Sequence, residues 1–195
     1  MTIDELLRRY GTTYAVEAGI RLRDQPAPLY QLLVLTTLLS VRIKADIAVA
    51  AARELFRAGW RTPRKMADST WQQRVDALGR AHYVRYDEST ATSLGEGAQR
   101  VLDVHHGDLR RMRADVPALR RSLTEFRRIG PTGAHIFCRE VQVVWPELRP
   151  YFDDRALRTA ADLGLPTDPK RLAARVAPDD VGTLAAALVR RGLAG

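Results

Sequence analysis

Apolar residues recur at helical spacing along nearly the whole chain, and no segment shows strand-like alternation of comparable strength. The most apolar stretch, residues 29–39, is typical of a buried helix. The pattern predicts helices over residues 3–10, 29–39, 47–56, 63–67, 70–78, 89–104, 117–126, 133–145, 154–163, 170–176 and 181–191. The sequence therefore predicts an all-α fold of about ten helices, with neither an internal repeat nor a low-complexity tract.

Capping residues and prolines set the expected helix ends. Thr2 and Glu5 form a capping-box pattern at the start of the first helix. Pro26 and Pro28 mark a break, because proline lacks the amide hydrogen that a helix interior needs. Asp46 is the expected N-cap of the helix over residues 47–56.

The composition is that of a globular protein with a basic charge balance. The 195 residues are 46% hydrophobic and 28% charged, and 31 Lys and Arg outweigh 23 Asp and Glu for a net charge of +8. This excess favours a polyanionic partner such as a nucleic acid. The alternative is a general bias towards arginine, since only Lys44, Lys65 and Lys170 are lysines.

Cysteine usage and hydropathy exclude several classes of protein. Cys138 is the only cysteine, so neither an intramolecular disulfide nor a cysteine-bound iron–sulfur cluster or four-cysteine zinc site can form within this chain. Charged residues interrupt the N-terminal segment, which lacks the pattern of a signal peptide. The apolar runs are far shorter than a membrane span. We expect a cytoplasmic protein without a membrane partner, metal or cofactor, associated with the nucleoid if it is bacterial.

The segment from Phe126 to Ala134 has the composition of a tight hairpin that opens a helix. Gly130 and Gly133 permit close approaches of the backbone, and Pro131 suits the first turn of the following helix. Amides at the start of that helix carry partial positive charge and can hold a DNA phosphate. The alternative is an ordinary connection between two helices.

In sequence order, several motifs together resemble the helix-hairpin-helix (HhH-GPD) DNA glycosylases of the endonuclease III superfamily. The segment 126–134, Phe-Arg-Arg-Ile-Gly-Pro-Thr-Gly-Ala, resembles the family's hairpin Leu-Pro-Gly-Val-Gly-x-x-Thr-Ala. Residues 38–46 resemble its Leu-Leu-Ser-x-Gln-x-x-Asp segment with one extra residue, and His82-Tyr83 resembles the Leu-Tyr of its DNA-wedging loop. Residues 152–158 resemble the Val-Asp-Thr-His-x-x-Arg that carries the family's catalytic Asp. The resemblance runs from about residue 29 to the last helix.

This chain departs from the family pattern at informative positions. Arg128 replaces the first hairpin glycine, and Thr132 stands where bifunctional members carry the lysine that forms a Schiff base. A hydroxyl cannot form an imine, so the resemblance implies a monofunctional enzyme without Lys-dependent lyase activity. The family's four cluster cysteines have no counterpart, as in related glycosylases that lack the cluster. Lys44 is the one amine expected near the cleft.

The resemblance implies a set of functional residues. Asp153 is the expected catalytic residue, because a carboxylate near C1′ can stabilise the positive charge that builds on the sugar and can orient a water. The alternative is that Asp153 only caps a helix, although Asp154 is the stronger candidate for that cap. The expected DNA-binding residues are Arg42, Lys44, His82, Tyr83, Arg85, Arg127, Arg128, Gly130, Thr132 and Gly133.

The implied architecture has two helical lobes with DNA across the cleft between them. Residues 29–134 would form a helical barrel lobe that ends in the hairpin, and residues 1–28 with 135–195 a second lobe that carries Asp153. The expected function is monofunctional base-excision repair of damaged, mismatched or modified double-stranded DNA by a monomer. Two alternatives remain open. One is a non-catalytic protein of the same fold that recognises distorted DNA, and the other is a helical protein-interaction domain.

Overall fold

The computed structural model describes all 195 residues and is entirely helical, as the hydrophobic pattern predicts. Its elements are α1 (Ile3–Tyr10), α2 (Tyr14–Glu17), α3 (Pro26–Leu39), α4 (Ala45–Arg57), α5 (Pro63–Asp68), α6 (Trp71–Arg80), α7 (Asp87–His105), the 3-10 helix η1 (Leu109–Met112), α8 (Val116–Thr124), α9 (Pro131–Val141), η2 (Pro146–Leu148), α10 (Asp154–Asp162), α11 (Pro169–Ala173), η3 (Pro178–Asp180) and α12 (Val181–Leu193). No helix combines the length with the hydropathy that a bilayer span would need.

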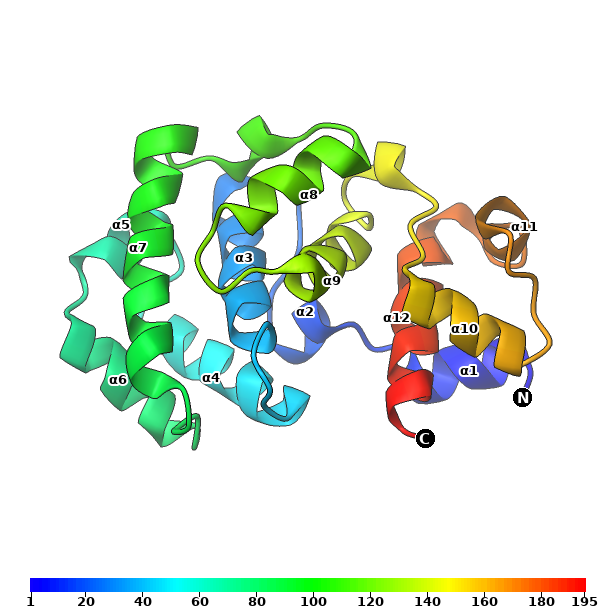
Figure 1. The fold of residues 1–195 in the computed structure, drawn as a ribbon, viewed down its shortest axis with the longest axis horizontal. Coiled ribbons are helices and arrows are strands. Elements are labelled where there is room, and N and C mark those ends of the chain that lie inside the picture. The colour runs from blue at the N-terminus through cyan, green and yellow to red at the C-terminus, as the bar shows by residue number, and fades with distance from the viewer.

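The helices form two lobes, each with its own hydrophobic core (Figure 1). The larger core runs from Tyr14 to Tyr151 and surrounds α3, whose side chains are buried over most of its length. The smaller core lies between α1, α10, α11 and α12, so both chain termini belong to the second lobe (Figure 1). The lobe boundaries expected from the sequence, after residues 28 and 134, differ from the extent of the two cores. Residues 14–20 and 137–151 pack into the larger core, because their apolar side chains contact that core.

Several helix starts also differ from the sequence prediction. Pro26 and Pro28 lie within the first turn of α3 and do not break the chain, since proline is tolerated where the amides have no partner within the helix. Lys44, and not Asp46, is the N-cap residue of α4. The short helix α2 was not predicted. Its first amides, of Tyr14 and Ala15, donate to the buried carboxylate of Glu140 at 3.2 and 3.1 Å, a partner distant in sequence.

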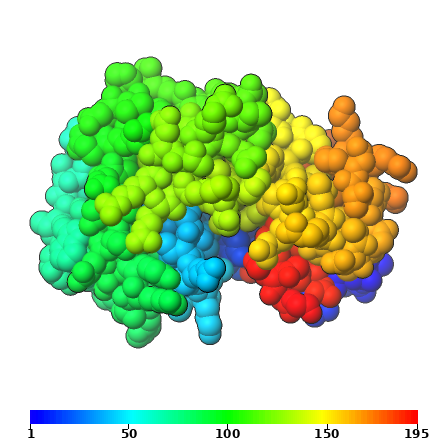
Figure 2. Space-filling view, in the orientation of Figure 1, coloured from blue at the N-terminus to red at the C-terminus, as the bar shows by residue number.

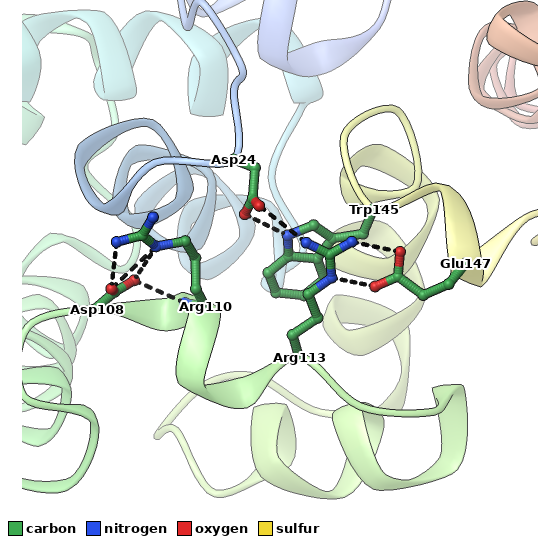
Figure 3. Close-up of polar contacts among 6 residues, drawn as sticks. All are labelled: Asp24, Asp108, Arg110, Arg113, Trp145 and Glu147. Atoms are coloured by element: carbon green, nitrogen blue, oxygen red, sulfur yellow. Dashed lines mark hydrogen bonds and ion pairs between the residues drawn. The ribbon is translucent and has the colours of Figure 1, made fainter.

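A polar network joins the segment between α2 and α3 to residues at the end of η1 and around η2 (Figure 3). The Asp24 carboxylate accepts from the Trp145 indole at 2.9 Å and from the Arg113 guanidinium at 2.9 Å. Arg113 also pairs with Glu147 and lies over the Trp145 ring. Because Trp145 is fully buried, its indole N–H needs this partner. The network therefore connects the segment before α3 with the end of η1 and with η2.

Candidate functional site

A cavity of about 710 Å³ lies between the two lobes. Its walls come from the turn after α3, the first half of α9, the start of α10 and the end of α12. Figure 2 shows the surface notched there, between the cyan residues after α3 and the red end of α12. Of the residues predicted from the sequence, it brings together Lys44, Thr132 and Asp153. Its volume is large enough for a small organic group.

Asp153 is both the N-cap of α10 and part of this cavity wall. Its Oδ1 accepts from the Ala156 amide at 3.0 Å, and its Oδ2 accepts from Nη1 of Arg139 at 2.6 Å. Only 7% of Asp153 is exposed, so the carboxylate is held in one orientation at the edge of the cavity. The cap that the sequence assigned to Asp154 is therefore made by Asp153, and Asp154 is exposed beside it.

The sequence reasoning missed Arg139, which holds the Asp153 carboxylate. The side chains of this ion pair are only 4% and 6% exposed, and Nε of Arg139 is buried without a hydrogen-bond partner. Arg139 and Glu140 are adjacent charges in the last turn of a largely apolar helix. That pattern was a usable signal, since charged residues are almost never buried unless they are paired.

His135 is a second cavity residue without an assigned role in the sequence. Its Nε2 lies 3.4 Å from the Arg120 guanidinium, which can only donate, so the neutral ring carries its proton on Nδ1 and donates to the Tyr151 hydroxyl. Burial lowers the pKa of His135 below its ordinary value of 6.5, and the charge of Arg120 lowers it further. The ring is therefore held neutral and fixed on both sides.

The hairpin between α8 and α9 keeps a left-handed turn although Arg128 replaces glycine. Arg128 has φ of 75°, a conformation that costs a non-glycine residue about 1–2 kcal/mol. Its guanidinium is half-buried, donates to the Ser89 hydroxyl and lies 5.7 Å from the centre of the Tyr86 ring. Arg127 is exposed and pairs with Glu96. Arg128 therefore points to α7 and the loop before it.

The two hairpin glycines serve different purposes. A Cβ on Gly133 would clash with the Ser40 hydroxyl oxygen and lie 3.1 Å from a methyl carbon of Ile129, so Gly133 is required where α9 meets α3. Gly133 is buried, and its direct contact with DNA stays a prediction. A Cβ on Gly130 would contact nothing within 4 Å. The packing of the protein leaves the backbone open there, next to the exposed Thr132.

The loop that follows α6 presents polar groups around a buried anchor. Tyr83 is fully buried and donates to the Leu38 carbonyl at 3.1 Å, so it is a core residue and its expected DNA contact is wrong. His82 is exposed with φ of 60°, and its amide closes the end of α6 by donating to Gly79. Val84, which the sequence reasoning passed over, is 61% exposed. This loop therefore carries an apolar side chain at the surface.

A stack of cations and one aromatic ring connects this loop to the hairpin. Arg85 lies 5.2 Å from the centre of the Tyr86 ring, and Arg128 contacts the same ring. Arg85 is exposed, as are Arg42 and Lys44 in the turn after α3. The expected DNA-binding cations other than Arg128 are thus at the surface, although only Lys44 among them reaches the cavity.

The residues present do not fit an iron–sulfur cluster or a metal site. Cys138 is buried in α9 against the core, where burial raises the pKa of its thiol to about 12. A cluster held by thiolates needs several cysteines that can deprotonate. No group of three or more His, Cys, Asp or Glu side chains is arranged to hold a metal ion.

Comparison with known proteins shows the fold. No family model matches the sequence, and neither does any curated protein. One solved structure that aligns is a trapped covalent endonuclease III–DNA intermediate, described as an estranged-adenine complex. Its TM-score is 0.57 at 16% identity, and the alignment covers 96% of this chain and 81% of that chain. A non-covalent endonuclease III–DNA complex aligns with a TM-score of 0.57 at 14% identity, covering 96% of this chain and 80% of that chain. The chain therefore has the all-α fold of endonuclease III.

Proposed function

We propose that this protein is a monofunctional DNA glycosylase of base-excision repair. It hydrolyses the N-glycosidic bond of a damaged, mismatched or modified base in double-stranded DNA, acting as a monomer and without a cofactor. One observation carries the proposal, namely the oriented Asp153 carboxylate at the wall of a cavity whose rim includes Thr132 at the hairpin. The fold adds support, because two of the solved structures that it matches are complexes with DNA.

Asp153 is suited to stabilise charge on a sugar placed in this cavity. Cleavage of an N-glycosidic bond builds positive charge at C1′, and a carboxylate fixed before the reaction stabilises that charge without having to reorganise. The Ala156 amide and Arg139 fix the two oxygens. Arg139 is thus a positioning residue. The same carboxylate can orient a water for attack on C1′.

DNA binding would use the exposed cations and the open backbone of the hairpin. Arg42, Lys44, Arg85 and Arg127 offer guanidinium or ammonium groups to phosphates, which supply most of the sequence-independent affinity. Open space lies where a Gly130 side chain would project, and the amides at the start of α9 could bind a phosphate from there. His82 and its exposed neighbour Val84 could fill the space of an extruded base.

The product would be an abasic site in an unbroken strand. Thr132 lies at the cavity where an amine would be needed for imine formation, and a hydroxyl cannot replace it. Lys44 is the one lysine among the cavity residues. An assay that separates base loss from strand cleavage therefore tests both residues.

A second function, recognition of distorted DNA without catalysis, is favoured by one specific observation. Both oxygens of Asp153 already have hydrogen-bond partners within the protein. If Arg139 neutralises the carboxylate too completely, Asp153 only caps α10 and the cavity binds an extruded base without cleaving its bond.

The test is a screen of duplex oligonucleotides that carry uracil, mismatched thymine or adenine, oxidised bases or alkylated bases. Each reaction is read with and without hot alkali, using the wild type, Asp153→Asn and Asp162→Asn. Asp162 is an exposed carboxylate at the other end of α10 and serves as the matched control.

Alkali-dependent breaks that disappear only in Asp153→Asn would support the monofunctional glycosylase and identify its base. Breaks without alkali would contradict the role given to Thr132 and point to Lys44. Tight binding to distorted duplex, without breaks on any substrate, would support the non-catalytic alternative.

A further inference from the structure

A second concave site lies on the larger lobe, formed by the segment after α2, the first turns of α3 and the end of α4 with the residues after it. It has a volume of about 630 Å³. Four arginines line it, and no carboxylate does: Arg21, Arg53, Arg57 and Arg61. Arg57 has a carboxylate partner, Glu54, but the other three arginines have none, and like charges around one hollow repel each other unless an anion joins them.

The floor of this arginine pocket is apolar. Ala18, Ala27, Pro28 and Phe56 line the pocket together with the arginines, and Gln31 adds an amide. Phe56 is only 5% exposed, so the floor is part of the packed core and is rigid. A rigid apolar floor with a few polar groups at the rim is the usual construction of a small-molecule site.

Two of the arginines are held in place by the protein, and two are free. Nε of Arg53 donates to the Glu17 carbonyl at 2.6 Å, and Arg57 pairs with Glu54, which also pairs with Arg80. Arg21 and Arg61 are exposed and make no side-chain hydrogen bond or ion pair. Arg53 is anchored to the backbone, whereas Arg57 is largely exposed, and Arg21 and Arg61 keep all of their donors for a ligand.

The arginine pocket is distinct from the candidate DNA surface. Helix α3 runs from the pocket to the turn that carries Arg42 and Lys44, and α4 returns from that turn and ends at the pocket. The 13 residues of α4 separate the two ends by about 20 Å at 1.5 Å per residue. A phosphate on the candidate DNA surface near Lys44 therefore cannot reach these arginines.

We propose that the arginine pocket binds a cluster of phosphate groups at a second, independent site. Guanidinium groups match phosphate oxygens with paired donors, and arginine is the preferred residue for such recognition. The phosphates belong either to a second stretch of nucleic acid or to a small phosphorylated molecule, since both present the same chemistry. The proposal does not depend on glycosylase activity, because it concerns the opposite end of the α3–α4 pair.

Two probes are used. The first is inorganic tripolyphosphate, whose binding is measured by calorimetry. The second is an undamaged 40-base-pair duplex, whose affinity is measured across a range of salt concentrations. The test variant is Arg21→Gln/Arg61→Gln, which removes the two arginines without internal partners and so leaves no carboxylate unpaired. The matched control is Arg111→Gln/Arg121→Gln, which removes the same charge from two exposed arginines that also lack side-chain partners.

We expect the test variant to weaken tripolyphosphate binding at least tenfold and the control to change it less than twofold. If nucleic acid is the natural ligand, the test variant also lowers the slope of log affinity against log salt by about 1.8, which corresponds to two lost phosphate contacts. If a small molecule is the ligand, the slope is the same in the test and control variants while tripolyphosphate binding is lost. Equal affinities of the two variants for both probes would overturn the proposal.

Discussion

The buried ion pair between Arg139 and Asp153 gives the sharpest test of how the site is held. Nη1 of Arg139 and Oδ2 of Asp153 are 2.6 Å apart, and both side chains are almost completely buried. Removal of one partner from such a pair leaves an uncompensated charge and costs about 3–5 kcal/mol. Because domains of this kind are stable by only about 5–15 kcal/mol, the loss is a large fraction of the free energy of unfolding.

We therefore expect Arg139→Met to lower the free energy of unfolding by about 3–5 kcal/mol. Asp153→Asn keeps an oxygen that can cap α10, so its loss comes mainly from leaving Arg139 unpaired. Asp153→Ala loses the cap as well, which adds about 1 kcal/mol. The double variant Arg139→Met/Asp153→Asn removes both charges and should be less destabilised than the sum of the single variants, by about 0.5–3 kcal/mol.

Urea unfolding followed by circular dichroism measures each free energy, and Asp168 supplies the control. Asp168 is the N-cap of α11, and its side chain accepts a hydrogen bond from the Arg171 amide at 2.8 Å. Unlike Asp153, it is exposed and has no cationic partner. Asp168→Ala should therefore cost about 1 kcal/mol, which is the value of a cap alone. A loss below about 1 kcal/mol in Arg139→Met would refute the reasoning, because it would mean that the pair is solvated like a surface salt bridge.

Four further predictions concern the hairpin and the cavity. Gly133→Ala should cost about 1–3 kcal/mol of stability in thermal unfolding because its Cβ meets Ser40, and Ser40→Ala in the same chain should restore part of the loss. Gly130→Ala should change the free energy of unfolding by less than about 0.5 kcal/mol, as other surface substitutions do. It should weaken the binding of duplex DNA in a titration. An unchanged affinity would count against a phosphate contact at this position. Because the pKa of His135 is lowered in the folded state, the folded protein binds fewer protons than the unfolded chain. The free energy of unfolding should therefore decline as the pH falls below about 6.5. His135→Gln should make the urea midpoint less dependent on pH in that range. Arg128→Gly should relieve up to about 1–2 kcal/mol of backbone strain while losing the Tyr86 contact, and should bind duplex DNA more weakly if that contact orients the hairpin.

The fold class was predictable because its signals are local. Apolar residues at helical spacing and strong caps such as Thr2 and Thr62 define helices from within the segment itself. The cap of Thr2 with Glu5 is formed as predicted. The short helix α2 escaped prediction because its first amides are held by Glu140, which lies more than 120 residues away in sequence. A pattern within four residues cannot reveal such a partner.

The candidate site was predictable only where a motif specifies chemistry. The motif around Asp153 pointed to a residue that lies at a cavity between the lobes. The motif could not tell that Tyr83 is buried or that Gly133 serves packing, because both depend on how α3 lies against other helices. Arg139 was missed for the same reason, since its partner is assigned only once α9 and α10 are placed together.

The distribution of backbone strain connects the fold to its proposed use. Two of the three non-glycine residues with positive φ are His82 and Arg128, and they lie in the two loops that meet at Tyr86. Glycine would adopt either conformation at no steric cost, so the side chains are retained against a cost of about 1–2 kcal/mol each. Strain of this kind persists only where the surrounding structure fixes the conformation, and it often lies at functional sites, although His106 with the same sign of φ is the C-cap of α7. Gly130 shows the opposite combination. A Cβ there would have no atom within 4 Å, yet the residue carries no side chain. An imidazole at one strained position and a half-buried guanidinium at the other thus flank the loops that we propose to contact the phosphate backbone, with the unstrained Gly130 beside them.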